Sequence, residues 1–308
     1  MTRAEDNLSV RAVAPETVRP LWRHYLELTK PRLSLLSVIT AMIGYLAAVP
    51  YSYVDWSRTF FVVLGTAFCA GGVAALNQWM ESDLDARMKR TADRPIPSGA
   101  VQPGSAFVVG WAMCIAGLMV LFKMVNGMSA FFALATIVAY VAIYTPSKRW
   151  SWWNTEIGAI SGALPPLIGW AAAGRSNGML GWCLFAILYA WQMPHFFSLA
   201  WTYRADYAAA NMKMLSVKDP GGRRVARRSF IWTVILVAAS GLPTLLGYCS
   251  WYYFAGAMAL GLWILGSSIT FLNPAKRDTE ARRLFFISIG YLPLILGILV
   301  IDRFIFKF

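Results

Sequence analysis

Long apolar runs constrain this 308-residue chain more than any other feature of its sequence. A helix needs about 20 apolar residues to cross a bilayer, and nine runs suit that length. They cover residues 33–50, 59–80, 105–123, 127–145, 156–173, 180–202, 229–247, 251–272 and 284–301. With 58% hydrophobic and 14% charged residues, the composition excludes a soluble globular protein. The sequence predicts an all-α polytopic membrane protein with nine transmembrane helices around a central cavity.

Positive charges between these runs predict the orientation of the chain. The segment before the first run and the loops after runs two, four, six and eight hold 23 of the 28 lysines and arginines. Because such loops stay in the cytoplasm, we expect a cytoplasmic N-terminus and a C-terminus on the opposite side. The bilayer then explains the net charge of +13, and no nucleic-acid partner is implied.

The N-terminal segment and the cysteines add further expectations. Residues 1–32 are polar and predict a cytosolic segment, followed by a single transmembrane domain over residues 33–308. The segment lacks the apolar core of a signal peptide, and its acidic residues are unlike a mitochondrial transit peptide. We therefore expect a bacterial plasma (inner) membrane. Three of the four cysteines lie within apolar runs, Cys249 lies between two of them, and none has CxxC spacing, which is typical of packing rather than of zinc or disulfides.

Oxygen-bearing side chains gather where the second run ends, in NQWMESDLDARMKRTADRP at residues 77–95. If the helix continues, Asn77, Glu81 and Asp85 share one face, while Asp83 points elsewhere. Such ligands suit Mg²⁺, which leaves its other positions to water and substrate phosphate. The alternative is simple polar capping of a membrane helix. The cations that follow could hold the phosphate, and they are Arg87, Lys89, Arg90 and Arg94.

A second polar site follows the sixth run, in WQMPHFFSLAWTYRADYAAANMKML at residues 191–215. Its polar side chains, on one helical stripe or just beyond it, are Gln192, His195, Tyr203, Asp206, Tyr207 and Asn211. Ionisable residues within spans default to functional hypotheses, although His195 could simply be hydrogen-bonded inside the bundle. Lys148 and Arg149 lie on the same membrane face and could grip a diphosphate. Retention of positive charge on the cytoplasmic side is the alternative for these two.

Three stretches carry a resemblance to a known family: residues 77–95, residues 191–215, and YTPSKRWSWWNTEIGAISGALPPLIGW at residues 144–170. In this order they resemble the UbiA-type intramembrane aromatic prenyltransferases, nine-helix proteins with two Asp-rich loops that face the cytoplasm. The resemblance covers roughly residues 25–300. His195 and the pair Asp206–Tyr207 look like the branch of this superfamily that acts on haem.

The resemblance implies roles for the polar residues. It implies a catalytic set of Asn77, Glu81, Asp85, His195 and Asp206, and Mg²⁺ ligands drawn from Asn77, Glu81, Asp83, Asp85 and Asp206. Relatives often carry several aspartates in the second motif, where this chain keeps only one, so binding of a second Mg²⁺ stays open. The implied substrate-binding residues are Arg87, Lys89, Arg90, Arg94, Lys148, Arg149, Gln192, Tyr203, Tyr207 and Asn211.

The reaction implied by the resemblance joins farnesyl diphosphate to haem b (protohaem IX). The vinyl group of haem b would attack farnesyl C1, diphosphate would leave, and water would supply a hydroxyl to give haem O for haem-copper oxidases. A haem A synthase or oxidase assembly proteins would be downstream partners. His195 could contact the haem iron, orient a propionate or take a proton from water. Two rival hypotheses are prenylation of another aromatic acceptor, such as hydroxybenzoate, and a non-enzymatic haem transporter or chaperone.

Overall fold

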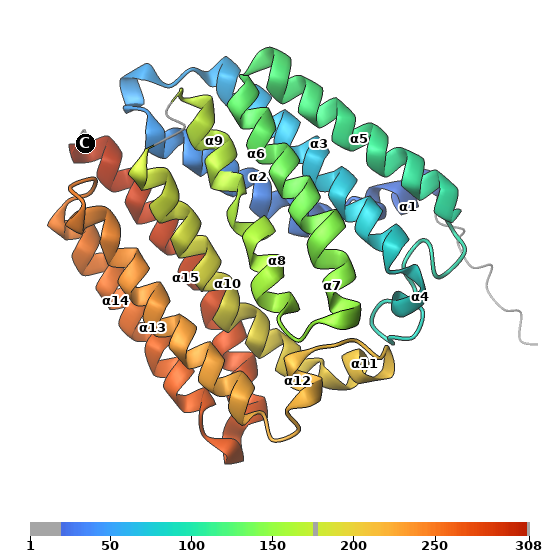
Figure 1. Cartoon of the computed structure of the whole chain (residues 1–308). Coiled ribbons are helices and arrows are strands. Elements are labelled where there is room, and N and C mark those ends of the chain that lie inside the picture. The colour runs from blue at the N-terminus through green and yellow to red at the C-terminus, as the bar shows by residue number, and fades with distance from the viewer. Residues whose placement is uncertain (1–19, 175–177, 307–308) are drawn as a thin grey trace, which may run out of the picture.

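The computed structural model describes residues 20–174 and 178–306, and every regular element in this part of the chain is a helix. The long helices lie side by side in one bundle (Figure 1). In chain order the elements are α1 (Leu21–Leu28), α2 (Pro31–Ala48), η1 (Tyr51–Tyr53), α3 (Trp56–Met80), α4 (Ser82–Asp85), α5 (Pro103–Met124), α6 (Gly127–Ile137), η2 (Val138–Tyr144), α7 (Thr145–Trp150), α8 (Asn154–Ala163), α9 (Pro165–Ala172), α10 (Met179–Thr202), α11 (Arg204–Ala209), α12 (Leu215–Lys218), α13 (Arg223–Leu245), α14 (Trp251–Phe271), η3 (Pro274–Lys276) and α15 (Arg277–Phe306). The prediction of an all-α fold is confirmed.

Eight helical segments within the described residues are long and apolar enough to cross a membrane. The fifth predicted run, residues 156–173, differs, because it forms two short helices, α8 and α9, that meet at Leu164. Pro165 and Pro166 cause this break, since proline lacks an N–H and clashes with the preceding turn but suits the first turn of a new helix. The two helices follow each other along the bundle (Figure 1). The count of nine spanning helices stays a prediction.

A closely packed pair of helices, α3 and α5, forms one edge of the bundle. Both carry the pattern G-x3-C-x2-G-x3-L, at residues 65–76 and 110–121, and they pair antiparallel. A Cβ added at Gly72 would lie 2.6 Å from Cys114 Sγ, and one added at Gly117 would lie 2.6 Å from Cys69 Sγ. Only glycine permits such an approach of two helix backbones. The pattern therefore fixes the register of the two helices.

The apolar core consists of two main clusters on either side of α2, α8 and α9. One cluster gathers buried side chains of α10, α13, α14 and α15, and the other those of α3, α5, α6 and α9. Between them, the helix that begins at Gly127 widens into the π-helical stretch η2 before it continues as α7. Such stretches are rare and often occur at functional sites. Tyr140 and Tyr144 both lie in this stretch, and their ring centroids are 5.1 Å apart.

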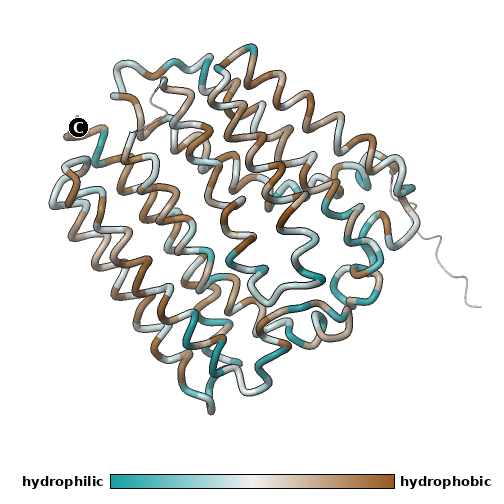
Figure 2. Tube along the Cα trace, in the orientation of Figure 1, coloured by the Kyte–Doolittle hydropathy of each residue, from teal (hydrophilic) through white to brown (hydrophobic). Residues whose placement is uncertain are grey.

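Polar residues concentrate at one end of the bundle, around α4, α11 and α12 (Figure 2). Residues 1–19 of the predicted cytosolic segment lie outside the described residues. The rest of that segment forms α1, whose last turn is held by Gln78, since Gln78 Nε2 donates to the carbonyls of Glu27 and Leu28 at 3.2 and 3.0 Å. Trp22 on α1 is exposed. An amphipathic helix of this kind suits a membrane interface.

Candidate functional site

Three oxygen-bearing side chains at the end of α3 lie in helical register. The helix ends at Met80, but Glu81 N still donates to Asn77 O at 3.0 Å, and Asp85 N donates to Glu81 O at 2.7 Å. Asn77, Glu81 and Asp85 are all buried, and each residue has at most 4% of its surface exposed. The i, i+4, i+8 register predicted for them is therefore present, although α4 is a separate short helix.

Cations neutralise this buried cluster. Lys148 Nζ lies 2.6 Å from Glu81 Oε1, and Arg94 Nη1 lies 2.6 Å from Asp85 Oδ2. The second oxygen of Asp85, Oδ1, is buried and accepts no hydrogen bond from any described residue. A buried carboxylate oxygen without a partner is costly and marks a place for an additional ligand. The cluster thus contains carboxylates that can bind a metal cation, together with lysine and arginine side chains that can bind an anion.

Asp83 does not join the buried cluster. Its side chain is half exposed, and both carboxylate oxygens accept hydrogen bonds from the Arg149 guanidinium, at 2.7 and 3.0 Å. These bonds lower the pKa of Asp83 below its ordinary value. In the described residues, no three Asp, Glu, His or Cys side chains lie close enough to hold a metal ion by themselves. A metal here would need the amide oxygen of Asn77 and oxygens from a substrate.

Sequence reasoning missed Lys30, which enters the site from the residue before α2. Its backbone is left-handed, with φ of 45°, a conformation that is strained for lysine and common at functional positions. Lys30 Nζ donates to Asn77 Oδ1 at 2.8 Å. Burial, with help from Arg94, lowers the pKa of Lys30 to about 7. In the sequence, Lys30 is marked only by its place next to the helix-starting Pro31, which does not predict a contact with Asn77.

The second polar segment meets the first at the same end of the bundle. Leu84 and Met88 pack in one apolar cluster with Ala210 and Met212. Asn211 has a left-handed backbone, with φ of 55°. It lines a pocket together with residues of the first segment and of α7. The lining residues are Asp83, Leu84, Arg87, Lys148, Arg149, Ala210, Asn211 and Met212. Two polar segments that are distant in the sequence therefore converge at this end of the bundle.

Not every predicted residue reaches this cluster. Asp206 is half buried, and its carboxylate makes no hydrogen bond or ion pair with any described residue. Lys89 is exposed and likewise contacts none of the buried carboxylates in the described chain. Arg90 lies over the ring of Tyr203, 4.8 Å from its centroid. Burial raises the pKa of Tyr207, whose neighbours include Arg90.

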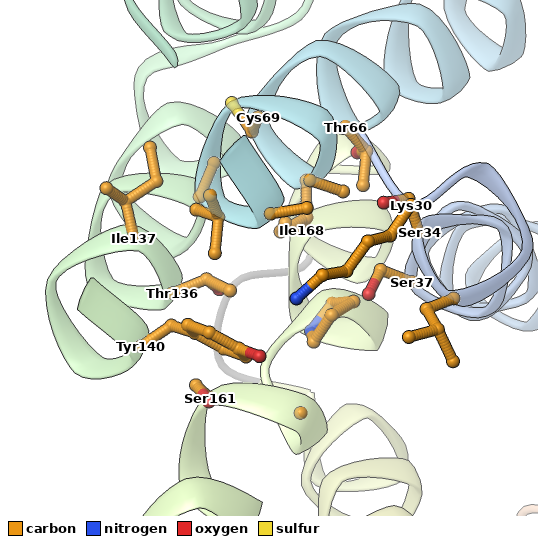
Figure 3. Close-up of a pocket in the computed structure, with 17 residues that line it drawn as sticks. Lys30, Ser34, Ser37, Thr66, Cys69, Thr136, Ile137, Tyr140, Ser161 and Ile168 are labelled. Carbon is orange, nitrogen blue, oxygen red and sulfur yellow. The ribbon is translucent and has the colours of Figure 1, made fainter. Parts of the chain in front are cut away.

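Two cavities lie beneath the charged cluster. The first is mostly apolar, and the Lys30 side chain extends into it (Figure 3). The second is larger, about 300 Å³ against about 130 Å³, and is lined by the predicted residues Gln192, His195 and Tyr207. The residues shared by both linings are Leu33, Ser37, Tyr140, Ser161 and Gly162. The cavities are thus adjacent and meet at one wall.

His195 is held between aromatic rings on the wall of the second cavity. The ring centroids of Trp191 and Phe285 lie 4.9 and 4.8 Å from that of His195. Its Nδ1 lies 2.9 Å from Ser288 Oγ, and the Ser288 hydroxyl donates to Phe285 O at 2.6 Å. A Ser288 hydroxyl that donates its proton to Phe285 O can only accept from Nδ1, so the His195 proton lies on Nδ1. Nε2 then keeps a lone pair for an iron atom or a proton.

Glu156 and Arg228 form another ion pair at this end, outside the cavities. Arg228 Nη1 lies 2.8 Å from Glu156 Oε1, and the guanidinium lies 3.9 Å from the ring centroid of Trp153. The pair joins the start of α8 to α13. Its position indicates a structural role.

These features define a class of protein: a polytopic membrane protein whose helices enclose an apolar cavity beneath a buried carboxylate and cation cluster. The chain belongs to the UbiA prenyltransferase family, which matches residues 37–290. The predicted resemblance to this family is therefore confirmed.

Two similar bacterial proteins have the same name. A protoheme IX farnesyltransferase from Opitutus terrae is 57% identical over 281 residues, which cover 91% of this chain and 94% of that protein. One from Solibacter usitatus is 43% identical and covers 91% and 99% of the two chains.

Solved structures share the fold at low identity. A digeranylgeranylglyceryl phosphate synthase is similar with a TM-score of 0.77 at 16% identity, over 92% of this chain and 99% of that one. A UbiA homolog from Archaeoglobus fulgidus, bound to GPP and Mg²⁺, is similar with a TM-score of 0.63 at 15% identity, over 90% and 99%.

Proposed function

We propose that this chain transfers the farnesyl group of farnesyl diphosphate to a vinyl group of haem b, giving haem O and diphosphate for the assembly of haem-copper oxidases. The observation that carries this proposal is the pair of adjacent cavities that meet beneath one buried charged cluster. A transfer between two substrates needs both reacting groups side by side below the leaving group. The names of the similar bacterial proteins supply the farnesyl and haem specificity.

The diphosphate would bind at the buried cluster. Asn77, Glu81 and Asp85 would hold Mg²⁺, with Asp206 approaching from α11, and the unpartnered Oδ1 of Asp85 fits such an ion. Bound Mg²⁺ would neutralise charge on the leaving diphosphate. Lys148 and Arg94 would turn from the carboxylates to the diphosphate oxygens, so that charges already in place stabilise the departing group. The remaining predicted cations would line the entrance to this cluster.

The two cavities would take the two organic groups. The prenyl tail would lie in the first cavity, against Val73, Ala133 and Ile168. The acceptor would lie in the second, where Gln192 and His195 face it. Tyr140 and Tyr144 would sit beside the carbon that gains positive charge, and aromatic faces attract cations. We place this site at the cytoplasmic face of a bacterial inner membrane, with α1 at the interface.

Product analysis tests the proposal. Membranes containing the chain receive farnesyl diphosphate and Mg²⁺ with either haem b or hydroxybenzoate, and the products are weighed by mass spectrometry. We expect hydroxyethylfarnesyl haem and released diphosphate from haem b alone. A prenylated hydroxybenzoate would refute the haem assignment. Movement of haem across liposomes without diphosphate release would support a transporter instead.

A further inference from the structure

The wall shared by the two cavities is unusually rich in hydroxyl groups. Of its five residues, three carry a hydroxyl: Ser37 from α2, Tyr140 from η2 and Ser161 from α8. These three groups and the Lys30 amine are directed into the same space (Figure 3). The other hydroxyl residues of the cavities, such as Thr136, line only one of the two.

These hydroxyls have hydrogen-bonding capacity to spare. Ser161 donates to Gly158 O at 2.7 Å and keeps its acceptor sites. The side chains of Ser37 and Tyr140 make no hydrogen bond with any other described residue. Thr136, by contrast, is satisfied within its own helix, since it donates to Phe132 O at 2.8 Å. A water in a protein needs two to four polar partners, which the wall can provide.

We propose that the hydroxyls of Tyr140 and Ser37, with Ser161, hold the water molecule that adds to the prenylated acceptor. This inference rests on the proposed function, which places farnesyl C1 at the mouth of the first cavity and the vinyl group in the second. Carbons that approach each other from the two cavities would meet at the wall that both cavities share. The π-helical stretch supports the assignment, because it turns Tyr140 out of regular helical register at this wall.

The chemistry of the step balances without an oxidant or reductant. The bond between farnesyl C1 and the diphosphate oxygen breaks, and its electron pair leaves with diphosphate. The vinyl electrons form the new bond to C1, and the adjacent vinyl carbon becomes a cation. The oxygen of the held water bonds to that carbon, and the proton it loses passes to the released diphosphate. Without a positioned water, the cation loses a proton instead and gives an alkene.

The competition between these two outcomes provides the test. Purified Tyr140→Phe and Ser37→Ala variants, each in lipid vesicles, receive farnesyl diphosphate, Mg²⁺ and haem b in oxygen-labelled water. We expect the ratio of labelled hydroxylated haem to the alkene, which is lighter by one water, to fall by about tenfold, the factor for one lost net hydrogen bond. Tyr53→Phe, at an exposed tyrosine in η1, is the matched control. Because the measure is a ratio, the amount of folded protein does not affect it.

The possible failures are distinguishable. If the wild-type protein forms no prenylated haem, the proposed function fails and this inference fails with it. If the wild type forms labelled hydroxylated haem and both variants keep its product ratio, only the water-holding role is overturned. Loss of all prenylation in both variants also overturns it, since a group that acts on the water step alone leaves the earlier carbon–carbon bond formation intact.

Discussion

Asp83 and Asp85 are two positions apart in the chain, and the fold gives them opposite environments. Asp85 is 1% exposed, paired with Arg94 through one oxygen and unpartnered at the other. Asp83 is half exposed and fully engaged by Arg149. A carboxylate that must bind a metal needs an available oxygen in a site protected from water. We therefore expect the metal role to fall on Asp85 and not on its neighbour.

Replacing Asp85 tests this expectation. Asp85→Asn keeps the shape of the side chain but removes its charge, so we expect farnesyl transfer at saturating Mg²⁺ to fall by about 100-fold or more, as for the loss of one stabilising group in a buried site. The variant should still be helical and monodisperse in detergent. The matched control is Asp93→Asn, at an exposed aspartate of the same loop. Equal activity of the two variants would contradict the metal role of Asp85.

At the residue scale, the sequence could predict the positions of those side chains that depend on helical spacing alone. Asn77, Glu81 and Asp85 follow each other at intervals of four, and any continuation of the helix places them on one face. Lys30 could not be found in this way. Its place depends on a left-handed backbone and on a contact with a residue 47 positions away, Asn77, and neither has a local signal.

Among the elements, α3 and α5 carry the feature that most limits sequence change. Their repeated pattern places Gly65 against Leu121 and Gly72 against Cys114. In the same way, the α5 residues Gly110 and Gly117 lie against Leu76 and Cys69 of α3. The added Cβ atoms would lie only 2.6 to 2.8 Å from their neighbours, which is closer than packed interiors tolerate without movement. α3 also carries Asn77 at its last turn. A change in the pairing of these helices should therefore reach the site.

Alanine substitutions test the packing of this pair. We expect Gly72→Ala and Gly117→Ala each to lower stability by about 1–3 kcal/mol, the usual cost of overpacking, measured as a lower unfolding midpoint in detergent. Gly266→Ala in α14 is the control, since its added Cβ would meet nothing within 4 Å. Alanine favours helix over glycine, so the control should be neutral or slightly more stable. Equal midpoints for all three variants would disprove the packing argument.

Long apolar elements were predictable, and their interruptions were predictable only in part. Eight spanning segments follow from apolar length alone. The break at Leu164 has a signal in the sequence, because two prolines follow it within the fifth apolar run. The π-helical stretch Val138–Tyr144 is followed by Pro146, but a proline predicts only that a helix ends or kinks and does not single out a π-helix.

At the scale of the whole molecule, hydropathy and charge predicted that polar segments share one end. The structure agrees, since the segments after α3 and α10 pack against each other. The excess of lysine and arginine in alternate loops predicts that this end lies in the cytoplasm.

Single cysteines can establish the orientation. The four native cysteines are at most 5% exposed, so they should not react with a membrane-impermeant maleimide. Lys89→Cys adds an exposed thiol at the polar end, and Tyr53→Cys adds one in η1, between α2 and α3. We expect Lys89→Cys to react only in inverted vesicles and Tyr53→Cys only in intact spheroplasts. The opposite pattern would reverse the assigned orientation.

The closely packed pair α3 and α5 also has a consequence during synthesis of the chain. Both helices, the intervening loop and the pair Asp85–Arg94 lie within residues 56–124, so these contacts are local in sequence, whereas Lys148 and Arg149 reach the loop from later in the chain. Helical hairpins with local contacts form quickly, and N-terminal units fold first as the chain emerges. We therefore expect the α3–α5 hairpin and the Asp85–Arg94 pair to form while the ribosome is still making α10, and Lys148 and Arg149 to join the loop afterwards.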